Sequence, residues 1–467
     1  MVQSEFIAAL DLGTSKMIAM VGKKNEQGIL SVMASEKIDS GSCMRKGYVY
    51  NVGEAAEKVN LLISRMNNKL DPKIDKVYVG VGGQSLHLEL YSAFRQVDGI
   101  VDDSVLLSME KECRAYDPEL YGVIEILSPE YYLDNRLTAE PKGLECKKIE
   151  ARYKLILGRP SIKNNLEISI KQKAKINIAG FFISPIASAE AVLIDREKEL
   201  GCALVEFGAG VTSVSVYKNS FLKHLVAIPV GGDVITKDIT TLNVLDDEAE
   251  DLKVNWGCAV VELDEQVKID EYPKIRTNDL NAVVEARLDE ILANVLEQIK
   301  VSGFGDVLGA GIIITGGGAN LKKIADAIRK KSGMEVRVAA IKKSLVNQAV
   351  DWANDTSNAE IVGLLTLGKE NCAVPAPVAP GKGTQGNLFP STNDETPPVN
   401  TTRGTRKPPG TSSSTNNSSP EGGSRESFFT RIRKSVGKGI EGASKGLFDE
   451  GDGYEDSENQ KNFKDEK

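Results

Sequence analysis

Apolar residues alternate with polar ones, or gather in short runs, through most of the first 370 residues. Residues 5–36 predict three consecutive strands, and a helix is expected from about Val52 to Met66 with Asn51 as its cap. A further strand is expected at Lys76–Gly82. Three strands, a helix and another strand predict an α/β layer.

The same kind of pattern returns later in the chain. A strand is expected at Ile176–Ile183, a helix at Ile186–Asp195, a buried strand at Ala310–Thr315 and a closing helix at Ala359–Gly368. Between these segments, residues 85–160 show alternating runs separated by polar turns, and a second such stretch runs to about Ile299. We expect these two stretches to be inserted units.

A glycine-rich turn occurs twice, each time directly after a short apolar strand. The first copy follows Ile7–Leu10 and reads Asp11-Leu12-Gly13-Thr14-Ser15-Lys16. The second follows Ala203–Val205 and reads Glu206-Phe207-Gly208-Ala209-Gly210-Val211-Thr212. Two such hairpins suggest duplicated halves that close on one nucleotide from opposite sides.

These turns carry residue types suited to phosphate. Glycine and small hydroxyl residues let backbone N–H groups face phosphate oxygens, and a nearby carboxylate can hold Mg²⁺ through water. We expect phosphate contacts from Gly13, Thr14, Ser15, Lys16, Gly208, Ala209, Gly210 and Thr212. Asp11 and Glu206 are the expected metal-side carboxylates, with Asp11 also near the phosphates.

A third turn, Gly316-Gly317-Gly318, follows the strand predicted at Ala310–Thr315 and precedes a helix. Bare backbone there would let a ribose or phosphate approach closely. One such turn is weak evidence, because glycine and aspartate serve many structural turns. The alternative to a nucleotide site is three unrelated tight turns.

Composition excludes several classes of protein. The chain has 467 residues, too many for one hydrophobic core, and its net charge of −8 argues against nucleic acid as a partner. Its six cysteines form no C-x-x-C pair, and His87 and His224 are its only histidines. Zinc and histidine chemistry are therefore not expected, and a reducing compartment is favoured. We see no signal peptide and no stretch of about 20 apolar residues that could span a bilayer.

The composition changes at Asn371. Residues 371–424 are rich in Pro, Gly, Ser, Thr and Asn and contain nine of the 17 prolines. Such a segment cannot bury enough apolar surface to offset its ordering entropy, so we expect a disordered tether. As a flexible coil it would span roughly 40 Å.

Residues 425–448 predict an amphipathic helix with a basic polar side. Apolar residues recur at helical spacing, and six basic residues against two acidic ones give a net charge of +4. The expected membrane contacts are Phe428, Phe429, Ile432, Arg433, Lys434, Val436, Ile440, Leu447 and Phe448. Binding to anionic lipid is the favoured interpretation. A groove on a partner protein and docking back onto the parent core are the alternatives.

Taken together, the motifs resemble the actin-like ATPase superfamily and, within it, the family of the bacterial cell-division protein FtsA. The resemblance covers 1–370 and 425–448. It rests on Leu10–Lys16, Ala187–Leu193, Ile228–Thr236, Glu250-x-x-Lys253 with Gly257-Cys258-Ala259, Thr315–Ala319 and Ile361–Leu365.

The resemblance implies an α/β, actin-like two-lobed fold of duplicated RNase H-like domains with two inserted subdomains, then a disordered linker and a C-terminal amphipathic helix. The implied divisions are the first-lobe core at 1–84, 161–198 and 346–370, inserted subdomains at 85–160 and 231–300, the second-lobe core at 199–230 and 301–345, the linker at 371–424, the helix at 425–448 and a charged disordered tail at 449–467.

The resemblance also implies a function. Such a protein binds ATP with Mg²⁺, polymerises with itself, recruits other division proteins and ties the C-terminal tail of FtsZ to anionic lipid on the cytoplasmic face of the inner membrane at the division site. Glu250 and Lys253 would flank the adenine, together with the turn Gly316–Gly318. Arg287 would belong to the FtsZ-binding surface; alternatively, it is a solvated helix residue.

Two positions depart from the superfamily pattern. Glu206 stands where an aspartate is usual, and Ser184 stands where hydrolases often carry Glu or Gln to orient water. Both favour nucleotide as a structural ligand, with slow hydrolysis at most.

Three other functions are alternatives. A sugar-kinase-like phosphotransferase would need an aspartate base, and a heat-shock chaperone would need a β-rich domain after residue 370. An actin-fold adaptor of another envelope assembly, of the pilus type, would lack the terminal helix.

Overall fold

The computed structural model describes residues 5–261, 268–347 and 351–374. The helix predicted at 425–448 and the tail at 449–467 lie outside the described residues, as does the predicted linker beyond residue 374.

A five-stranded sheet forms the first half of the core, in the order β11–β6–β1–β2–β3. Its strands are β1 (Phe6–Leu12), β2 (Lys16–Lys24), β3 (Leu30–Asp39), β6 (Lys76–Val81) and β11 (Asn177–Ile183). Every residue from Ile7 to Leu12 is buried. Because successive strand residues point to opposite faces, both faces of the sheet must be covered at β1. Helices α1 (Val52–Lys69) and α11 (Ala359–Leu367) pack against this sheet.

The second half of the core repeats this topology. In the first half, β1 has β2 and then β3 as antiparallel neighbours on one side, and β6 and then β11 as parallel neighbours on the other. In the second half, β12 has β13 and β14 on one side and β17 and β18 on the other, in the same senses. These strands are β12 (Cys202–Phe207), β13 (Thr212–Lys218), β14 (Phe221–Ile228), β17 (Ile312–Thr315) and β18 (Val336–Val338).

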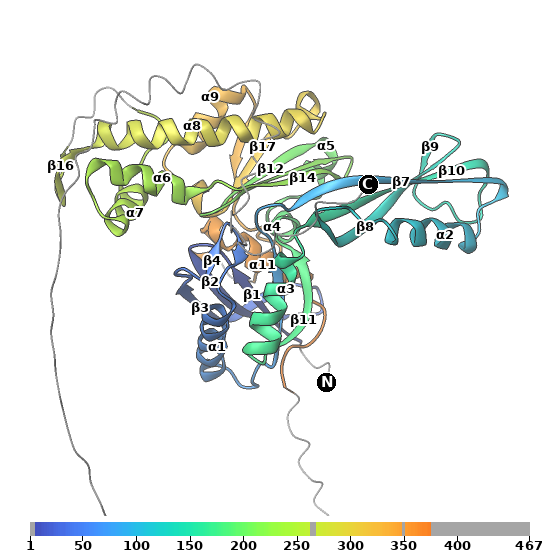
Figure 1. Ribbon diagram of the computed structural model, residues 1–467, viewed down its shortest axis with the longest axis horizontal. Coiled ribbons are helices and arrows are strands. Elements are labelled where there is room, and N and C mark those ends of the chain that lie inside the picture. The colour runs from blue at the N-terminus through green and yellow to red at the C-terminus, as the bar shows by residue number, and fades with distance from the viewer. Residues whose placement is uncertain (1–4, 262–267, 348–350, 375–467) are drawn as a thin grey trace, which may run out of the picture. The chain divides into compact units, whose positions relative to one another are not determined.

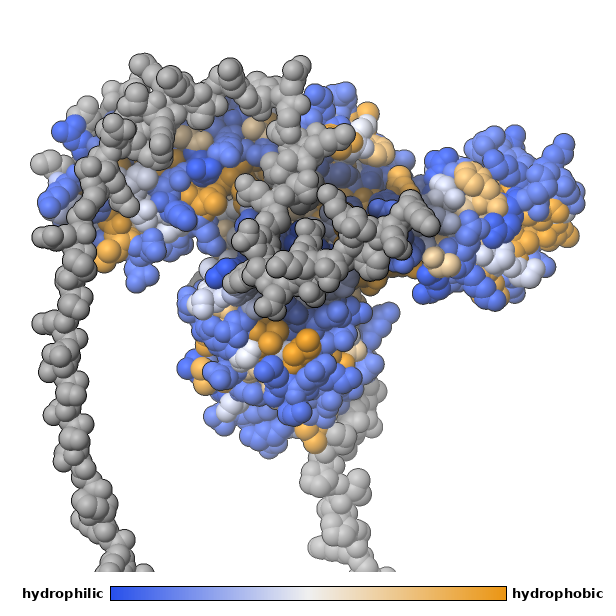
Figure 2. All heavy atoms as spheres, in the orientation of Figure 1, coloured by the Kyte–Doolittle hydropathy of each residue, from blue (hydrophilic) through white to orange (hydrophobic). Residues whose placement is uncertain are grey.

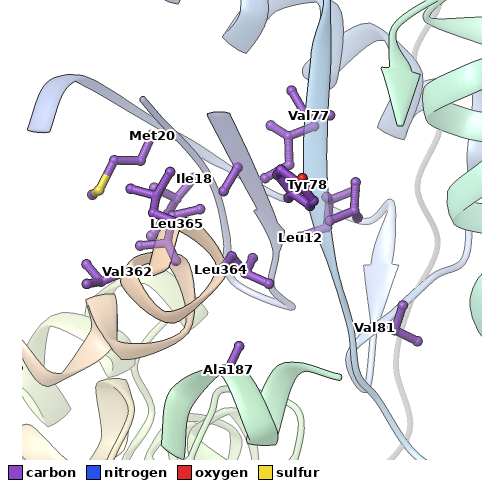
Figure 3. Packing of buried hydrophobic residues seen from close by; sticks show 14 of the residues in the cluster. Leu12, Ile18, Met20, Val77, Tyr78, Val81, Ala187, Val362, Leu364 and Leu365 are labelled. Carbon is purple, nitrogen blue, oxygen red and sulfur yellow. The ribbon is translucent and has the colours of Figure 1, made fainter. Parts of the chain in front are cut away.

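Two helices cross where the halves of the core meet (Figure 1). They are α4 (Ser184–Val192) and α11. A Cβ added at Gly363 would lie 1.9 Å from the Ala187 carbonyl oxygen, so only glycine allows this crossing. On the other side, Val362, Leu364 and Leu365 of α11 are buried near Ile18 and Met20 of β2 (Figure 3).

Residues 85–160, here called the first inserted unit, extend the second sheet. The unit contains β7 (His87–Ile100), α2 (Asp103–Arg114), β8 (Gly122–Leu133), β9 (Arg136–Thr138) and β10 (Glu145–Gly158). Strand β7 joins β14 through the pair His87 and Val226, and β10 lies between β7 and β8. Several large apolar side chains are exposed on this unit. Hydrophobic patches are visible on its surface in Figure 2. They are Leu90, Phe94, Ile100, Leu107, Leu120, Leu137 and Leu144.

The second inserted unit, residues 231–300, is built mainly of helices in its described parts, 231–261 and 268–300. Its elements are α6 (Gly232–Ile239), η2 (Thr240–Leu242), α7 (Asp246–Asn255), β15 (Lys268–Ile269), β16 (Tyr272–Arg276) and α8 (Thr277–Val301). Leu280, Val284, Leu288 and Ile291 of α8 share one hydrophobic core with β12, β13 and β17.

Short elements complete the described chain. They are β4 (Met44–Arg45), β5 (Tyr48–Val49), α3 (Ser161–Glu167), the π-helical turn η1 (Ile168–Lys173), α5 (Asp195–Leu200), η3 (Gly305–Val307), η4 (Gly317–Asn320), α9 (Ile324–Ser332), α10 (Asp351–Asn354) and η5 (Thr356–Asn358).

Two sequence predictions illustrate what local pattern can give. Asn51 does cap α1, since its side-chain oxygen accepts hydrogen bonds from the N–H groups of Gly53 and Glu54. The helix expected at Ile186–Asp195 is α4, which begins two residues earlier, at Ser184, and ends at Val192. Leu193 follows with an extended backbone, and α5 begins at Asp195.

Candidate functional site

The first glycine turn connects β1 to β2, and at Gly13 it has no room for a side chain. A Cβ at Gly13 would lie 2.8 Å from the carbonyl oxygen of Lys16. The Thr14 hydroxyl oxygen accepts a hydrogen bond from the Gly47 N–H at 2.9 Å. The turn is therefore fixed both by its own backbone and by the segment at Gly47.

The second glycine turn connects β12 to β13 in the same way. The Gly208 N–H donates to the Val211 carbonyl oxygen at 2.9 Å, and a Cβ at Gly208 would lie 2.7 Å from that oxygen. The carbonyl oxygens of Gly208 and Ala209 accept hydrogen bonds from Gly232 and Asp233. The start of α6 thus holds this turn in place.

The two turns touch each other. A Cβ at Gly210 would lie 2.7 Å from the Thr14 hydroxyl oxygen and 3.0 Å from the Lys46 Cα. Both turns line one cavity of about 490 Å³. This volume is in the range of pockets that bind small molecules and cofactors.

The third glycine turn lies at the same cavity. Gly316 has φ +85°, and a Cβ there would lie 2.6 Å from the Phe207 carbonyl oxygen, so the position requires glycine. The Thr356 hydroxyl donates to the Gly316 carbonyl oxygen at 2.7 Å. This bond ties the turn to η5, just before α11.

Most of the residues expected at a nucleotide site line this cavity. They are Asp11, Gly13, Thr14, Ser15, Lys16, Glu206, Gly208, Ala209, Gly210, Glu250, Lys253, Gly316, Gly317 and Gly318. Thr212 is not among the lining residues: it is fully buried, and its hydroxyl donates to the Val230 carbonyl oxygen at 2.9 Å. Val211 and Ser213 line the cavity instead, because neighbouring residues of a strand point to opposite faces.

Three lysines line the cavity, Lys16, Lys37 and Lys253. The Lys16 ammonium donates to the Ser357 hydroxyl at 2.6 Å. Burial and the charge of Lys37 lower the pKa of Lys16, whereas Asp355 and Asp11 act in the opposite direction. A bound anion would therefore stabilise the positive charge of Lys16. Lys37 and Ser357 were not found from the sequence, because each lies on a segment without a recognisable motif.

Lys253, at the end of α7, is held by local partners. Its ammonium donates to the Thr236 hydroxyl at 2.7 Å, to a Glu250 carboxylate oxygen at 2.5 Å and to the Gly232 carbonyl oxygen at 3.2 Å. Apolar side chains line the same cavity, among them Leu288, Ile291, Leu321 and Ile324. These surfaces suit a flat, partly polar ring.

Five carboxyl side chains line the cavity: Asp11, Glu206, Glu250, Asp355 and Glu360. Asp11, Glu206 and Glu360 have raised pKa values. Burial raises the pKa of Asp11 to about 6, against the opposing charge of Lys16. Burial raises the pKa of Glu206 to about 7, although the Ser188 hydroxyl donates to it at 2.9 Å. Burial, with the charges of Asp11 and Glu206, raises the pKa of Glu360 well above its ordinary value.

Glu360 was missed by the sequence analysis. Its only local signal is that it directly precedes the apolar run Ile361–Leu365, where a carboxyl group has no obvious reason to be buried. Within the described ranges, no group of three or more His, Cys, Asp or Glu side chains is arranged to hold a metal ion.

Arg287 lies away from the cavity lining, on α8. Its guanidinium donates twice to the Asp238 carboxylate, at 2.6 and 3.2 Å, and once to Glu290 at 2.6 Å. Its side chain is 29% exposed. The residue joins α6 to α8 and keeps part of its surface accessible.

In the described part of the chain, no helix has both the length and the apolar character needed to cross a bilayer.

Comparison with solved structures shows the fold. The chain is similar to a structure titled "PilM-PilN type IV pilus biogenesis complex", with a TM-score of 0.56 and 13% sequence identity over 77% of this chain and 97% of that chain. At this identity the likeness concerns the fold alone. It confirms the α/β, actin-like fold of duplicated halves expected from the sequence.

Comparison of sequences shows the family. The family model "Cell division protein FtsA" matches residues 203–363. A relative described as cell division protein FtsA from Porphyromonas gingivalis is 32% identical over 352 residues, which is 73% of each chain. Another, from Escherichia coli K12, is 27% identical over 394 residues, 79% of this chain and 91% of that relative. This chain belongs to the family of the cell division protein FtsA.

Proposed function

We propose that this chain binds ATP with Mg²⁺ in the cavity lined by its three glycine turns. The observation that carries this proposal is the contact between the two hairpins, Gly210 against Thr14, over one cavity. Backbone N–H groups of both turns would face the phosphates, and Lys16 would pair with them. Asp11 and Glu206 would hold Mg²⁺ through water, and the cation would neutralise phosphate charge.

Other parts of the cavity lining suit a nucleoside. They are the bare backbone at Gly316–Gly318, the side chains of Glu250 and Lys253, and several apolar residues. We assign these residues to the ribose and adenine. Ser184 cannot orient a water molecule as a longer Glu or Gln side chain would, so hydrolysis should be slow at most.

We further propose that the protein is a polymerising adaptor that ties the FtsZ ring to the inner membrane and recruits other division proteins. Membership of the family supports a role in division. It favours that role over a pilus-type adaptor or a sugar-kinase-like phosphotransferase. The second inserted unit, with Arg287, would receive the FtsZ tail, and residues 425–448 would bind anionic lipid at the cytoplasmic face of the membrane.

Vesicle co-sedimentation tests the adaptor role. The full chain should pellet with vesicles containing anionic lipid and should carry a labelled FtsZ tail peptide with it. A chain lacking 425–467, and the double variant Ile432→Glu with Val436→Glu, should stay in the supernatant while still binding the peptide. Equal pelleting by the truncated chain would refute the membrane role, and no binding of peptide by any variant would refute the FtsZ role.

A further inference from the structure

Glu360 is held at the point where three elements meet. It is the second residue of α11, and its Oε1 accepts a hydrogen bond from the Ser184 hydroxyl, at the first residue of α4, at 2.5 Å. A Cβ at Gly80 of β6 would lie 2.1 Å from that same oxygen. The bare backbone of Gly80 therefore makes the room in which this carboxyl group sits.

Glu360 lies in the first turn of α11, where the free N–H groups of the helix N-terminus favour a carboxylate. The residues that follow it, Ile361, Val362, Leu364 and Leu365, belong to the apolar core. Across residues 5–261, 268–347 and 351–374, no lysine or arginine forms an ion pair with it. A carboxyl group kept in a cavity without a cation costs folding free energy. Such groups gather at functional sites.

The contact with Ser184 places Glu360 where a water-orienting group is missing. Ser184 carries only a short hydroxyl, and that hydroxyl is directed to the Glu360 carboxyl group. Both residues line the cavity that holds the two phosphate-type turns.

We propose that Glu360 is the catalytic residue of ATP hydrolysis in this protein, with its carboxylate orienting the attacking water and Ser184 acting as a positioning residue. This rests on the proposed function, since it requires ATP in the cavity. The water oxygen forms a bond to the γ-phosphorus while the bond from that phosphorus to the bridging oxygen of ADP breaks. The proton of the water passes to the Glu360 carboxylate and then to solvent, and ADP and inorganic phosphate are the products.

The electrostatics of the cavity agree with slow turnover. Burial, and then the like charges of Asp11 and Glu206, raise the pKa of Glu360 well above its ordinary value. Because only the ionised carboxylate can accept a proton, these effects lower the fraction of molecules that is competent for hydrolysis.

The test compares Glu360→Gln with the unaltered full chain. The amide keeps the volume and can still accept from Ser184, but it cannot take a proton. In single-turnover experiments with radiolabelled ATP and Mg²⁺, the rate should fall about 100-fold. The Kd for a non-hydrolysable ATP analogue should stay within about threefold, and chromatography should find ATP rather than ADP retained on the variant. A rate equal to that of the unaltered chain, or no hydrolysis by the unaltered chain, would overturn the proposal.

Further variants keep the result interpretable. Ser184→Ala should slow hydrolysis about 10-fold, because the Glu360 carboxylate would no longer be held in one orientation by the Ser184 hydroxyl. Glu360→Asp keeps the negative charge but shortens the side chain, and it tests the proposal if Glu360→Gln fails to fold. It should also slow hydrolysis. An unchanged rate would contradict the proposal. Glu370→Gln is the matched control, because Glu370 is exposed and its carboxylate pairs with Lys76 at the surface. Absence of analogue binding by the unaltered chain would instead refute the proposed function.

Discussion

The two phosphate-type hairpins have the same backbone but different chemistry. In the first, Leu12 pairs with Met17 across the turn, and in the second, Phe207 pairs with Thr212. Lys16 of the first hairpin therefore corresponds to Val211 of the second. At this position the first hairpin brings a cation to the cavity, and the second brings an apolar side chain.

This difference shows that the two duplicated halves contribute different chemical groups to the cavity. The carboxyl group of Asp11 lies close enough to Lys16 for the ammonium to oppose the effect of burial on its pKa. Glu206 has no cation among the groups that act on it, and it relies on the hydroxyls of Ser188 and Ser213. The first hairpin is suited to bind charge, and the second to close over it.

The largest expected effect concerns Glu206 and pH. The pKa of Glu206 is about 7 in the folded protein, against 4.5 for an ordinary glutamate, so the folded state binds this proton more tightly than the unfolded state. The stabilisation of the fold by this proton is fully present below about pH 4.5 and is lost as pH rises through about 7. Glu206→Gln should therefore raise the free energy of unfolding at pH 8 by about 3 kcal/mol and leave it nearly unchanged at pH 4.5.

Urea unfolding of the nucleotide-free protein at both pH values measures this effect. Ser188→Ala is the informative companion, because it removes a hydroxyl that stabilises the ionised form and should steepen the loss of stability with pH. A Glu206→Gln variant with the same pH dependence as the unaltered chain would show that Glu206 is as well solvated as an ordinary surface carboxylate.

The next effect concerns Lys16. Lys16→Ala removes the cation that the first hairpin brings to the cavity and should weaken ATP binding about 30-fold, or about 2 kcal/mol. Lys23→Ala is the matched control on the same strand, since Lys23 lies over the Phe6 ring and does not line the cavity. Calorimetric titration with ATP measures both. Equal affinities for the two variants would mean that the hairpins do not differ in the way proposed.

The smallest effect concerns Thr212. Thr212→Val removes the hydrogen bond to the Val230 carbonyl oxygen and should lower the free energy of unfolding by about 1 kcal/mol without changing the ATP affinity. Thr212→Ser, which keeps the hydroxyl, should restore most of the stability. A tenfold loss of ATP affinity in Thr212→Val would place its hydroxyl at the nucleotide and make the second hairpin more like the first.

The sequence by itself determined the local parts of this protein. The hairpins at Asp11–Lys16 and Glu206–Thr212, the third turn at Gly316–Gly318 and the cap at Asn51 could be found because glycine, small hydroxyl residues and asparagine impose their conformations on the nearest few residues. The family resemblance was found from the same segments. Alternation along β13 could also have shown that Thr212 points away from Val211 and Ser213.

Only the tertiary structure decided which distant residues share the cavity. Ser184 and Glu360 are 176 positions apart, and Lys16 and Ser357 are 341 apart. Periodicity tells which face of a helix or strand a residue occupies, but it does not tell which other element packs against that face. The raised pKa of Glu360 depends on the same packing, because burial and the neighbouring charges of Asp11 and Glu206 exist only once the halves of the core have come together.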